Sequence, residues 1–280
     1  MRVTLHQLLS GALQSGYAIP CFNVFGYEDA VAVVKAAEQK NAPVILAVNK
    51  EMMEFMGPVQ SASMLGTLAD ESSAEVCVHL DHCYDEKIAM AAVEAGYTSI
   101  MFDGSQLPLQ ENIDRTASLV EFAARHGVSV EGEIGSVSYS KGRDYIRHQL
   151  TEPEQAKTFA DSTGVHAVAV SIGNVHRLES ATSSVDQNLL SRIAEVVSQP
   201  LVIHGTSGIP DADLTVLAKT SVCKFNIGTR LRQAFGKSLK QFLSENPAEF
   251  DRLTIFNSIM PAVQVEAARH IELLGATNRS

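Results

Sequence analysis

The chain has 280 residues, 45% of them hydrophobic, and its formal net charge at pH 7 is −10. A chain of this length can bury one sizeable core, so we expect one domain over residues 1–280. Acidic and basic residues are interspersed along the sequence, which argues against a surface for nucleic acid or anionic membranes. The sequence has neither an apolar run of membrane-spanning length nor a secretory leader, and we therefore expect a cytoplasmic protein.

The four cysteines, Cys21, Cys77, Cys83 and Cys223, have no paired spacing. Three of them lie in apolar stretches that are typical of strands. We expect reduced thiols in the core rather than a disulfide framework.

Short β-branched runs alternate with longer amphipathic stretches from one end of the chain to the other. The pattern predicts eight strands, at Ala18–Val24, Pro43–Asn49, Val76–His82, Ser99–Gly104, Ser129–Gly135, Ala167–Gly173, Pro200–Gly205 and Val222–Gly228. It predicts helical segments between them, among them Tyr27–Asn41, Asp85–Gly96, Leu109–Gly127, Pro153–Gly164 and Pro210–Thr220. Alternation of this kind is typical of repeated βα units around a parallel sheet. Eight such units favour a closed (βα)8 TIM barrel of the α/β class over an open, doubly wound sheet.

Two further helices are predicted after the eighth strand. The first covers Arg230–Asn246, and the second runs from about Ser258 to Leu274. We therefore expect the barrel to carry an extra C-terminal helix.

Polar and ionisable side chains collect where the predicted strands end. In a TIM barrel the carboxyl ends of the strands form the face at which active sites lie. The residues at or just after these ends are Asn23, Asn49, Asp81, His82, Asp103, Glu131, Glu133, His176, His204, Ser207, Asn226 and Thr229. We expect all eight strands to contribute to one mouth.

Three histidines, His82, His176 and His204, end the third, sixth and seventh predicted strands or follow them closely. They can therefore converge although they are far apart in the sequence. Three imidazoles suit zinc or a similar divalent ion and leave a coordination position for substrate. A single histidine at a strand end is more often a hydrogen-bonded structural residue, but the three together indicate a metal site.

The alternation of side chains along a strand bears on the residues before His82. His79 precedes it by three positions and is expected on the opposite face, so we do not expect His79 to be a ligand. Asp81 would also point away from His82 unless the strand ends there, and a new helix predicted just beyond Cys83 and Tyr84 supports such an end. We expect Asp81 and His82 both to reach the mouth.

Acidic residues mark the fourth and fifth predicted strands. Glu131 and Glu133 point to the same side of the fifth strand, and Asp103 ends the fourth. Buried acids in a strand need a partner or a metal. One interpretation is a metal site, and the other is an ion pair with a neighbouring lysine or arginine.

Two glycine-containing segments follow the seventh and eighth predicted strands, and both are suited to hold an anion. The first includes Gly205, Thr206 and Ser207, and the second is Asn226, Ile227, Gly228 and Thr229. The loops at this place in a TIM barrel are the usual phosphate cradle, because their backbone amides and a helix amino terminus present partial positive charge. We predict a phosphate site there.

With these features in place, the sequence resembles the class II, metal-dependent ketose-bisphosphate aldolases, which include fructose-1,6- and tagatose-1,6-bisphosphate aldolases. The resemblance runs from about Gly16 to Gly275. Its motifs are FNV at Phe22–Val24, HLDH at His79–His82, MFDGS at Met101–Ser105, VEGEIG at Val130–Gly135, SIGNVH at Ser171–His176, HGTSG at His204–Gly208 and KFNIGT at Lys224–Thr229.

The resemblance implies a metal centre with two positions. His82, His176 and His204 match the ligands of a catalytic Zn²⁺ ion. Asp103 and Glu133 match contacts to an alternative or second position, for a divalent or monovalent cation. The resemblance also implies a homodimer or homotetramer, which the extra C-terminal helix supports.

The reaction that the resemblance implies is the reversible cleavage of a ketose phosphate to dihydroxyacetone phosphate and an aldehyde. The metal would act as a Lewis acid on the C2 carbonyl and C3 hydroxyl oxygens when the C3–C4 bond breaks. Asp81 matches the acid/base that takes the C4 hydroxyl proton and returns it in condensation. Lys224 suggests an alternative mechanism in which a lysine forms a Schiff base, but the three histidines favour the metal-dependent mechanism.

The substrate is expected to contact residues on several strands. The segments Gly205–Ser207 and Asn226–Thr229 match the family's cradle for the C1 phosphate. Asn23 and Asn49 are expected to line the same site.

The sequence departs from the family pattern at several positions. Arg177 follows His176 where a glycine is usual, which either brings an extra cation to the phosphate or displaces the loop, and Arg230 stands where an acidic residue is common. The loop over residues 136–148 lacks the usual glycine pair and glutamates, so the second acid/base is not assigned. It carries Tyr139, Lys141, Arg143, Asp144 and Tyr145 instead.

Arg252 occupies the position of an arginine that binds the distal C6 phosphate in the family, but the usual proline before it is missing. Arg252 is expected to serve that phosphate, across a subunit interface. If it does not, the substrate is a ketose 1-phosphate or carries another terminal group.

Two other functions compete with that of an aldolase. A metal-dependent barrel hydrolase would activate water at the ion, but such enzymes commonly have a His-x-His pair where this chain has Asn23. A non-catalytic barrel would bind a sugar phosphate as a sensor or scaffold. Asp81 beside the three histidines argues against this reading.

Overall fold

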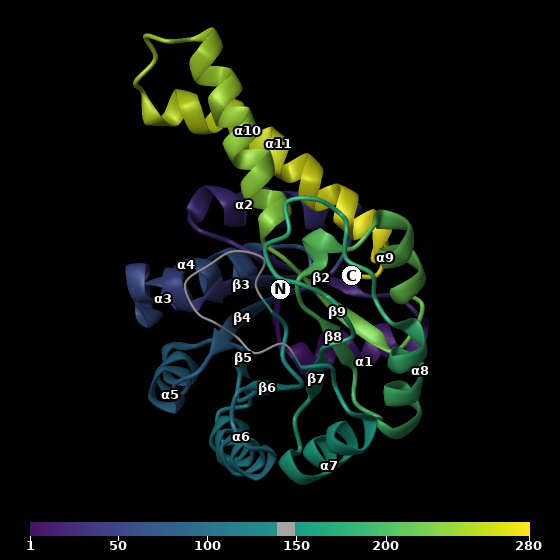
Figure 1. Ribbon diagram of the computed structural model, residues 1–280. Helices are drawn as coiled ribbons and strands as arrows, with labels where there is room; N and C mark the ends of the chain where they lie inside the picture. Colours follow the sequence, from purple (N-terminus) through teal and green to yellow (C-terminus); the bar gives the residue numbers. More distant parts are fainter. Residues whose placement is uncertain (139–148) are drawn as a thin grey trace.

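A closed ring of eight parallel strands forms the centre of the computed structural model, which describes residues 1–138 and 149–280 (Figure 1). The strands of the ring are β2 (Ile19–Asn23), β3 (Val44–Asn49), β4 (Val76–Cys83), β5 (Ser99–Phe102), β6 (Ser129–Ile134), β7 (Ala167–Val170), β8 (Leu201–Ile203) and β9 (Val222–Ile227). Each pairs with the next in chain order, and β9 pairs with β2 to close the ring. The predicted (βα)8 TIM barrel is confirmed.

Most of the helices cover the outside of the ring. In chain order, the helices are α1 (Leu5–Ser15), α2 (Tyr27–Lys40), α3 (Lys50–Met56), α4 (Pro58–Glu71), α5 (Glu86–Ala95), α6 (Leu109–Ala124), α7 (Pro153–Thr163), α8 (Gln187–Val196), the short 3-10 helix η1 (Thr206–Gly208), α9 (Asp211–Leu217), α10 (Thr229–Glu245) and α11 (Arg252–Leu273). In α2, for example, Ala30, Val33 and Ala37 are completely buried on one face. Because such faces pack on the strands, the strands are buried on both sides and read as nearly continuous apolar runs.

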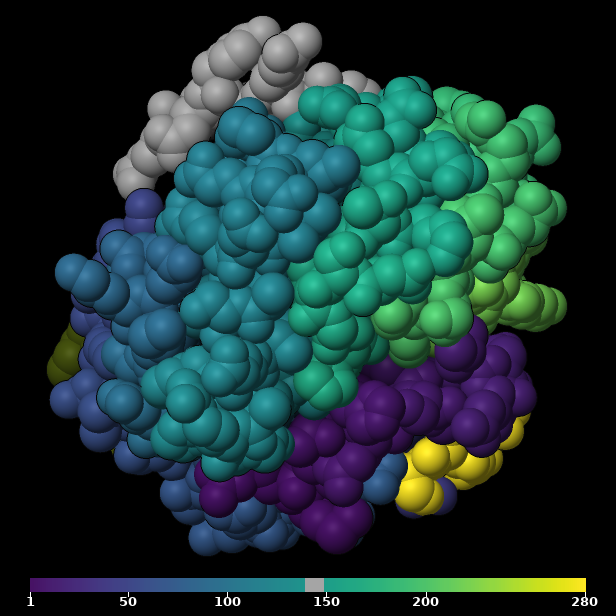
Figure 2. All heavy atoms as spheres, turned by 90° about the horizontal axis from the view of Figure 1, so that it is seen from below, coloured from purple at the N-terminus to yellow at the C-terminus, as the bar shows by residue number. Residues whose placement is uncertain are grey.

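The amino-terminal end of the barrel is closed by both ends of the chain. The short strand β1 (Arg2–Val3) pairs with the start of β4, and α1 contacts β2, β4, β6 and β9. At the other end of the chain, Leu274 accepts a hydrogen bond from the backbone of Ala18, and Arg279 lies over the ring of Tyr17. In Figure 2 the N-terminal segment (purple) and the C-terminal residues (yellow) lie side by side. The carboxyl ends of the strands open on the opposite side.

The helices α10 and α11 project from the barrel as a pair (Figure 1). The helix α11 begins at Arg252 rather than near Ser258, where it was predicted. Asp251 caps it, because its carboxylate accepts a hydrogen bond from the backbone N–H of Thr254 at 2.7 Å.

Within the described residues, no helix combines the length and the apolarity needed to cross a bilayer. All four cysteines are buried and free.

The end of β4 breaks the regular alternation of side chains. The backbone φ of His82 is 49°, in the left-handed region, and the pairing with β5 shifts register between Leu80 and Cys83. The strand does not end at His82, as the sequence suggested, but continues to Cys83. A left-handed conformation costs a non-glycine residue roughly 1–2 kcal/mol. At His82 this conformation lets Asp81 and His82 both face the mouth.

Candidate active site and metal centre

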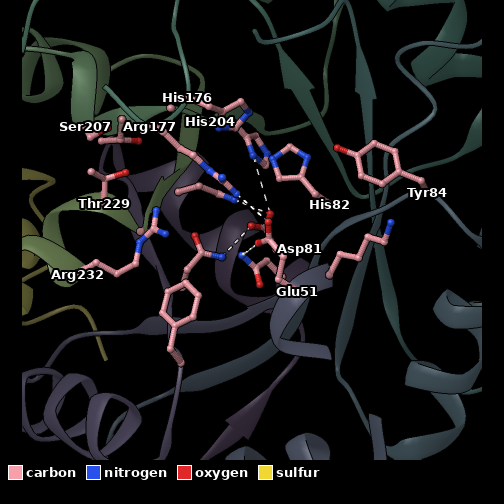
Figure 3. Close-up of a pocket in the computed structure, with 18 of the residues that line it drawn as sticks. Glu51, Asp81, His82, Tyr84, His176, Arg177, His204, Ser207, Thr229 and Arg232 are labelled. Carbon is pink, nitrogen blue, oxygen red and sulfur yellow. Dashed lines mark hydrogen bonds and ion pairs between the residues drawn. The ribbon is translucent and has the colours of Figure 1, made fainter. Parts of the chain in front are cut away.

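A cavity of about 560 Å³ lies at the carboxyl ends of the strands (Figure 3). It is lined by Asn23, Phe25, Asn49, Lys50, Glu51, Glu54, Asp81, His82, Tyr84, Gln106, His176, Arg177, His204, Gly205, Thr206, Ser207, Asn226, Gly228, Thr229 and Arg232. Most of the residues predicted for the site are in this set. The barrel thus brings strand ends that are far apart in the sequence to one wall.

The imidazoles of His82, His176 and His204 gather on one side of the cavity (Figure 3). The ring centroids are 4.9 Å apart for His82 and His176, 4.4 Å for His82 and His204, and 5.9 Å for His176 and His204. One nitrogen of each ring lies within 4.8 Å of the other two. Zinc binds imidazole nitrogens at about 2.0–2.1 Å, so small side-chain adjustments would bring all three to one ion.

His82 is oriented by Asp103 at the end of β5. Its Nδ1–H donates to Asp103 Oδ2 at 3.0 Å, and the hydroxyl of Ser105 donates to Asp103 Oδ1 at 2.6 Å. Burial alone would raise the pKa of Asp103, but the hydrogen bonds from His82 and Ser105 outweigh it and bring the pKa to about 2. Asp103 is therefore an ionised anchor for the His82 ring.

His204 is completely buried at the end of β8 and is held by Glu131 of β6. Its Nε2–H donates to Glu131 Oε1 at 2.9 Å. Its Nδ1 lies 3.9 Å from Asp81 Oδ1 and has no hydrogen-bond partner among the described residues. Burial, with His82 and Lys224 nearby, keeps the pKa of His204 well below its usual value. The ring is neutral, which is the form that binds a metal.

His176 lies in the loop after β7, and Gly205 lets this loop approach the end of β8. Gly205 has a φ of 69°, and a Cβ there would come within 2.6 Å of the backbone carbonyl of Val175. Only glycine therefore allows the segments that carry His176 and His204 to pass so closely. Burial and the nearby His82 lower the pKa of His176 to about 3, so this ring is also neutral.

Asp81 lies between the imidazoles and two asparagine amides. Its Oδ2 accepts from Asn23 Nδ2 and its Oδ1 from Asn226 Nδ2, each at 2.8 Å (Figure 3). Burial alone would raise the pKa of Asp81, but nearby groups, His82 and Lys224 among them, outweigh it and bring the pKa to about 2. The carboxylate is therefore ionised and fixed in direction at neutral pH.

A second group of candidate ligand atoms lies behind His82, away from the cavity. It consists of His82, Asp103 and Glu133, with Glu133 Oε2 at 3.8 Å from His82 Nδ1. Burial and the neighbouring Asp103 raise the pKa of Glu133 well above its usual value. A cation bound there would favour the ionised form of Glu133.

Another part of the wall includes Ser207 and Thr229, at the starts of two helices (Figure 3). The 3-10 helix η1 follows β8, and α10 begins at Thr229 directly after β9. The residue before α10 is Gly228, which has no side chain to cap the first amides of this helix. The hydroxyl of Thr206 is buried and has no hydrogen-bond partner among the described residues. Free amides at a helix amino terminus attract anions.

A family model described as fructose-bisphosphate aldolase class-II matches residues 3–279. The chain belongs to this family. It is therefore a class II aldolase, a carbon–carbon lyase, as the sequence motifs predicted. Neither the hydrolase nor the non-catalytic barrel fits this membership.

Solved structures agree with this family. The YdjI aldolase from Escherichia coli K12 is 30% identical, with a TM-score of 0.88, and the match covers 100% of this chain and 99% of that one. A fructose-bisphosphate aldolase from Campylobacter jejuni is 22% identical, with a TM-score of 0.87, and the match covers 100% of this chain and 97% of that one. The second likeness supports the fold alone.

Three residues predicted for the substrate site of this aldolase are not free to bind substrate in the cavity as expected. Asn49 lines the cavity, but its Oδ1 caps α3 by accepting from Met52 N–H at 3.0 Å. Ile227 is buried within β9 and lies outside the cavity lining. Arg252 lies on the projecting helix pair, with a side chain that is 75% exposed and paired with Glu28 at 3.0 Å. The predicted residues of the 136–148 loop, Tyr139, Lys141, Arg143, Asp144 and Tyr145, lie outside the described residues.

Arg177 lines the cavity in an unusual backbone conformation, with a φ of 58°. Its guanidinium pairs with Glu51 Oε1 at 2.9 Å. The aldolase therefore has a cation at this position, but one whose charge is partly balanced.

The sequence reasoning missed several residues of the cavity wall. Lys50, Glu51 and Glu54 come from α3, which the sequence did not single out as a helix. Arg232 comes from the first turns of α10, and its guanidinium lies over the ring of Phe25 at 5.2 Å from the centroid. Burial and nearby Arg177 lower the pKa of Arg232. A basic residue one turn beyond the glycine-rich segment is the signal that could have identified it.

Proposed function

We propose that this aldolase cleaves a ketose 1-phosphate or 1,6-bisphosphate, reversibly and with a divalent metal, to dihydroxyacetone phosphate and an aldehyde. The observation that carries the proposal is the meeting, in one cavity, of three imidazoles with nitrogens within 4.8 Å of one another, an ionised carboxylate and a wall suited to an anion. Each of these parts corresponds to one requirement of the reaction: charge stabilisation, proton transfer and substrate positioning.

The residues of the site fit a divalent ion. His204 presents a buried Nδ1 that lacks a hydrogen-bond partner among the described residues, next to nitrogens of His82 and His176 within 4.8 Å. A set of three nitrogens favours Zn²⁺, and we propose one catalytic Zn²⁺ there. When bound, this ion would supply Lewis-acid stabilisation of the negative charge that develops as the C3–C4 bond breaks. Asp103 and Glu133 provide a harder, oxygen-rich position for a second cation.

Asp81 is proposed as the acid/base. Because it is ionised and held by Asn23 and Asn226, it can accept the C4 hydroxyl proton during cleavage without first losing one of its own. In condensation it would return that proton to the aldehyde oxygen. The two amides fix the direction of both carboxylate oxygens.

We propose that the C1 phosphate binds at the wall formed by Gly205, Thr206, Ser207, Gly228 and Thr229. Both η1 and α10 begin at this wall, and Arg177 and Arg232 add positive charge to the same cavity. Two guanidiniums that lie close together in a half-buried cavity repel each other. A phosphate between or beside them would relieve that repulsion.

The rest of the cavity favours a substrate with one phosphate. Glu51 and Glu54 line it, and Glu51 already neutralises part of the charge of Arg177. Arg252, the residue expected at a distal phosphate, does not line this cavity. It lines the adjoining apolar cavity, where its side chain pairs with Glu28. We therefore infer that ketose 1-phosphates are better substrates than the 1,6-bisphosphates.

A coupled assay for dihydroxyacetone phosphate over a panel of ketose phosphates tests these proposals. We expect release from at least one ketose 1-phosphate, loss of release after chelation, and recovery with Zn²⁺. We expect kcat/KM for the best 1-phosphate to exceed that for fructose and tagatose 1,6-bisphosphates by at least about tenfold, a difference of about 1.4 kcal/mol. Turnover that survives exhaustive chelation would contradict metal dependence, and a preference for the bisphosphates would contradict the substrate assignment.

The projecting helices support a homodimer or homotetramer. Phe250 is 91% exposed in the connection between α10 and α11, and Leu253 is 72% exposed in the first turn of α11. A second, apolar cavity of about 650 Å³, whose lining includes Phe55, Met56 and Phe256, lies at the base of the pair. Apolar side chains exposed beside an apolar cavity are typical of an interface between identical chains.

Light scattering of the purified enzyme checks this assembly. We expect the mass of a dimer or tetramer, and a shift toward the monomer in a Phe250→Asp/Leu253→Asp variant. A monomeric wild-type enzyme would exclude this assembly.

A further inference from the structure

A lysine is buried inside the barrel directly below the cavity. Lys224 of β9 is 0% exposed and lies outside the cavity lining. Its Nζ lies 2.8 Å from Glu131 Oε2 and donates to Asn226 Oδ1 at 2.6 Å. Burying an ammonium group is costly even when it is paired, and an apolar side chain would fill the same space at lower cost. The two hydrogen-bonding partners of Lys224, Glu131 and Asn226, indicate the role of this buried charge.

One partner leads to the proposed metal centre. Glu131 uses Oε2 for Lys224 and Oε1 for the Nε2–H of His204, at 2.9 Å. This hydrogen bond fixes the tautomer of His204, so that the lone pair is on Nδ1. A carboxylate behind a metal-binding histidine sets the ring orientation and raises its basicity. Lys224 holds that carboxylate in place.

The other partner leads to the proposed acid/base. Asn226 accepts from Lys224 through Oδ1, so its Nδ2 must point the other way, toward Asp81 Oδ1 at 2.8 Å. The lysine thereby fixes which way the Asn226 amide is turned. With the amide reversed, an oxygen would face the ionised Asp81 and repel it.

We propose that Lys224 is a positioning residue that aligns His204 through Glu131 and Asp81 through Asn226. This inference rests on the proposed function, because it concerns the residues that would hold the metal and move the proton. It also explains why Lys224 does not form a Schiff base: its ammonium is enclosed and bonded on two sides, away from the substrate. Burial would lower the pKa of Lys224, but Glu131 and Asp81 are among the groups that hold it above its usual value.

The test begins with a Lys224→Met variant, which keeps the length of the side chain and removes its charge. We expect the dissociation constant for Zn²⁺, measured by competition with a chromophoric chelator, to rise about 10–100-fold. We expect kcat at saturating Zn²⁺ and substrate to fall at least about tenfold, because Asn226 loses the partner that orients it toward Asp81. The Zn²⁺ measurement needs no turnover and reports on the Glu131 side alone.

A double variant separates positioning from simple charge balance. In Lys224→Met/Glu131→Gln both charges are removed together, which restores folding if the single variant is unstable. The glutamine still accepts from His204, but as a neutral group, and Asn226 still lacks its lysine. We expect a melting temperature near that of the wild type, with Zn²⁺ affinity and kcat both still reduced.

Ser61→Ala is the control for the loss of a buried hydrogen bond. Ser61 is completely buried in α4 and hydrogen-bonds the hydroxyl of Tyr97 at 2.7 Å, outside the cavity lining. This variant should lower the melting temperature without changing Zn²⁺ affinity or kcat. A double variant with wild-type Zn²⁺ affinity and kcat, or a Ser61→Ala variant with the same losses as Lys224→Met, overturns the proposal. A wild-type enzyme that binds no divalent ion would instead contradict the proposed function.

Discussion

An Asp81→Asn variant is expected to fold and to bind Zn²⁺ but to lose about 10²–10⁴-fold in kcat, the usual contribution of a positioned acid/base. Asparagine has nearly the same shape as aspartate, but it cannot accept the C4 hydroxyl proton. Steady-state kinetics at saturating metal and substrate, with the bound metal determined on the same sample, measure the effect.

The hydrogen bonds of Asp81 explain why this variant should fold. The new amide has one accepting oxygen for two donors. Asn226 cannot turn, because its Oδ1 is occupied by Lys224. Asn23 bonds Asp81 through Nδ2, and its amide can turn to accept from the new NH₂ group. We expect a loss of about 1 kcal/mol in the free energy of unfolding, the typical value of one hydrogen bond.

Asp85→Asn provides the same substitution four residues further along the chain. Asp85 caps α5 by accepting from Lys87 N–H at 2.8 Å and lies outside the cavity lining. Asparagine caps helices about as well as aspartate, so both kcat and stability should stay close to the wild type. If Asp81→Asn retained more than about a tenth of the wild-type kcat, Asp81 would not be the acid/base.

The fold and much of the site followed from short patterns in the sequence. Parallel strands in a closed barrel end on one face, so polar residues at strand ends had to converge there. The element types and their order were therefore enough to place His82, His176 and His204 in one wall, without any knowledge of the distances between them.

The parts that the sequence did not predict depend on backbone detail or on contacts across the barrel. The φ of 49° at His82 places this side chain beside Asp81, and no pattern of residue types reveals it. The sequence alone left open whether Glu131 is a metal ligand or an ion-pair partner. The structure shows an ion pair with Lys224, which faces Glu131 from a strand on another side of the ring. The stacking of Arg232 on Phe25 is likewise a contact between distant segments.

A His176→Ala variant is expected to lose more than about 10³-fold in activity, and added Zn²⁺ should not restore it. Lewis-acid stabilisation by a bound ion is worth several kcal/mol, and each 1.4 kcal/mol is a factor of about ten in rate. His176 is the preferred ligand for this test because it lies in a loop rather than in a strand of the ring, so its removal should disturb the barrel least.

Three samples separate loss of metal from loss of structure: the chelated wild type, the wild type after addition of Zn²⁺, and the variant with the same addition. The first and third should be equally inactive, and the second fully active. The matched control is His270→Ala, which removes another buried imidazole. His270 is 1% exposed in α11, bonds the backbone oxygen of Glu266 through Nδ1 at 3.0 Å and lies outside the cavity lining, so this variant should keep its Zn²⁺ and its turnover. Equal losses in His270→Ala and His176→Ala would mean that the effect comes from the packing of buried histidines, because only His176 is placed to reach the ion.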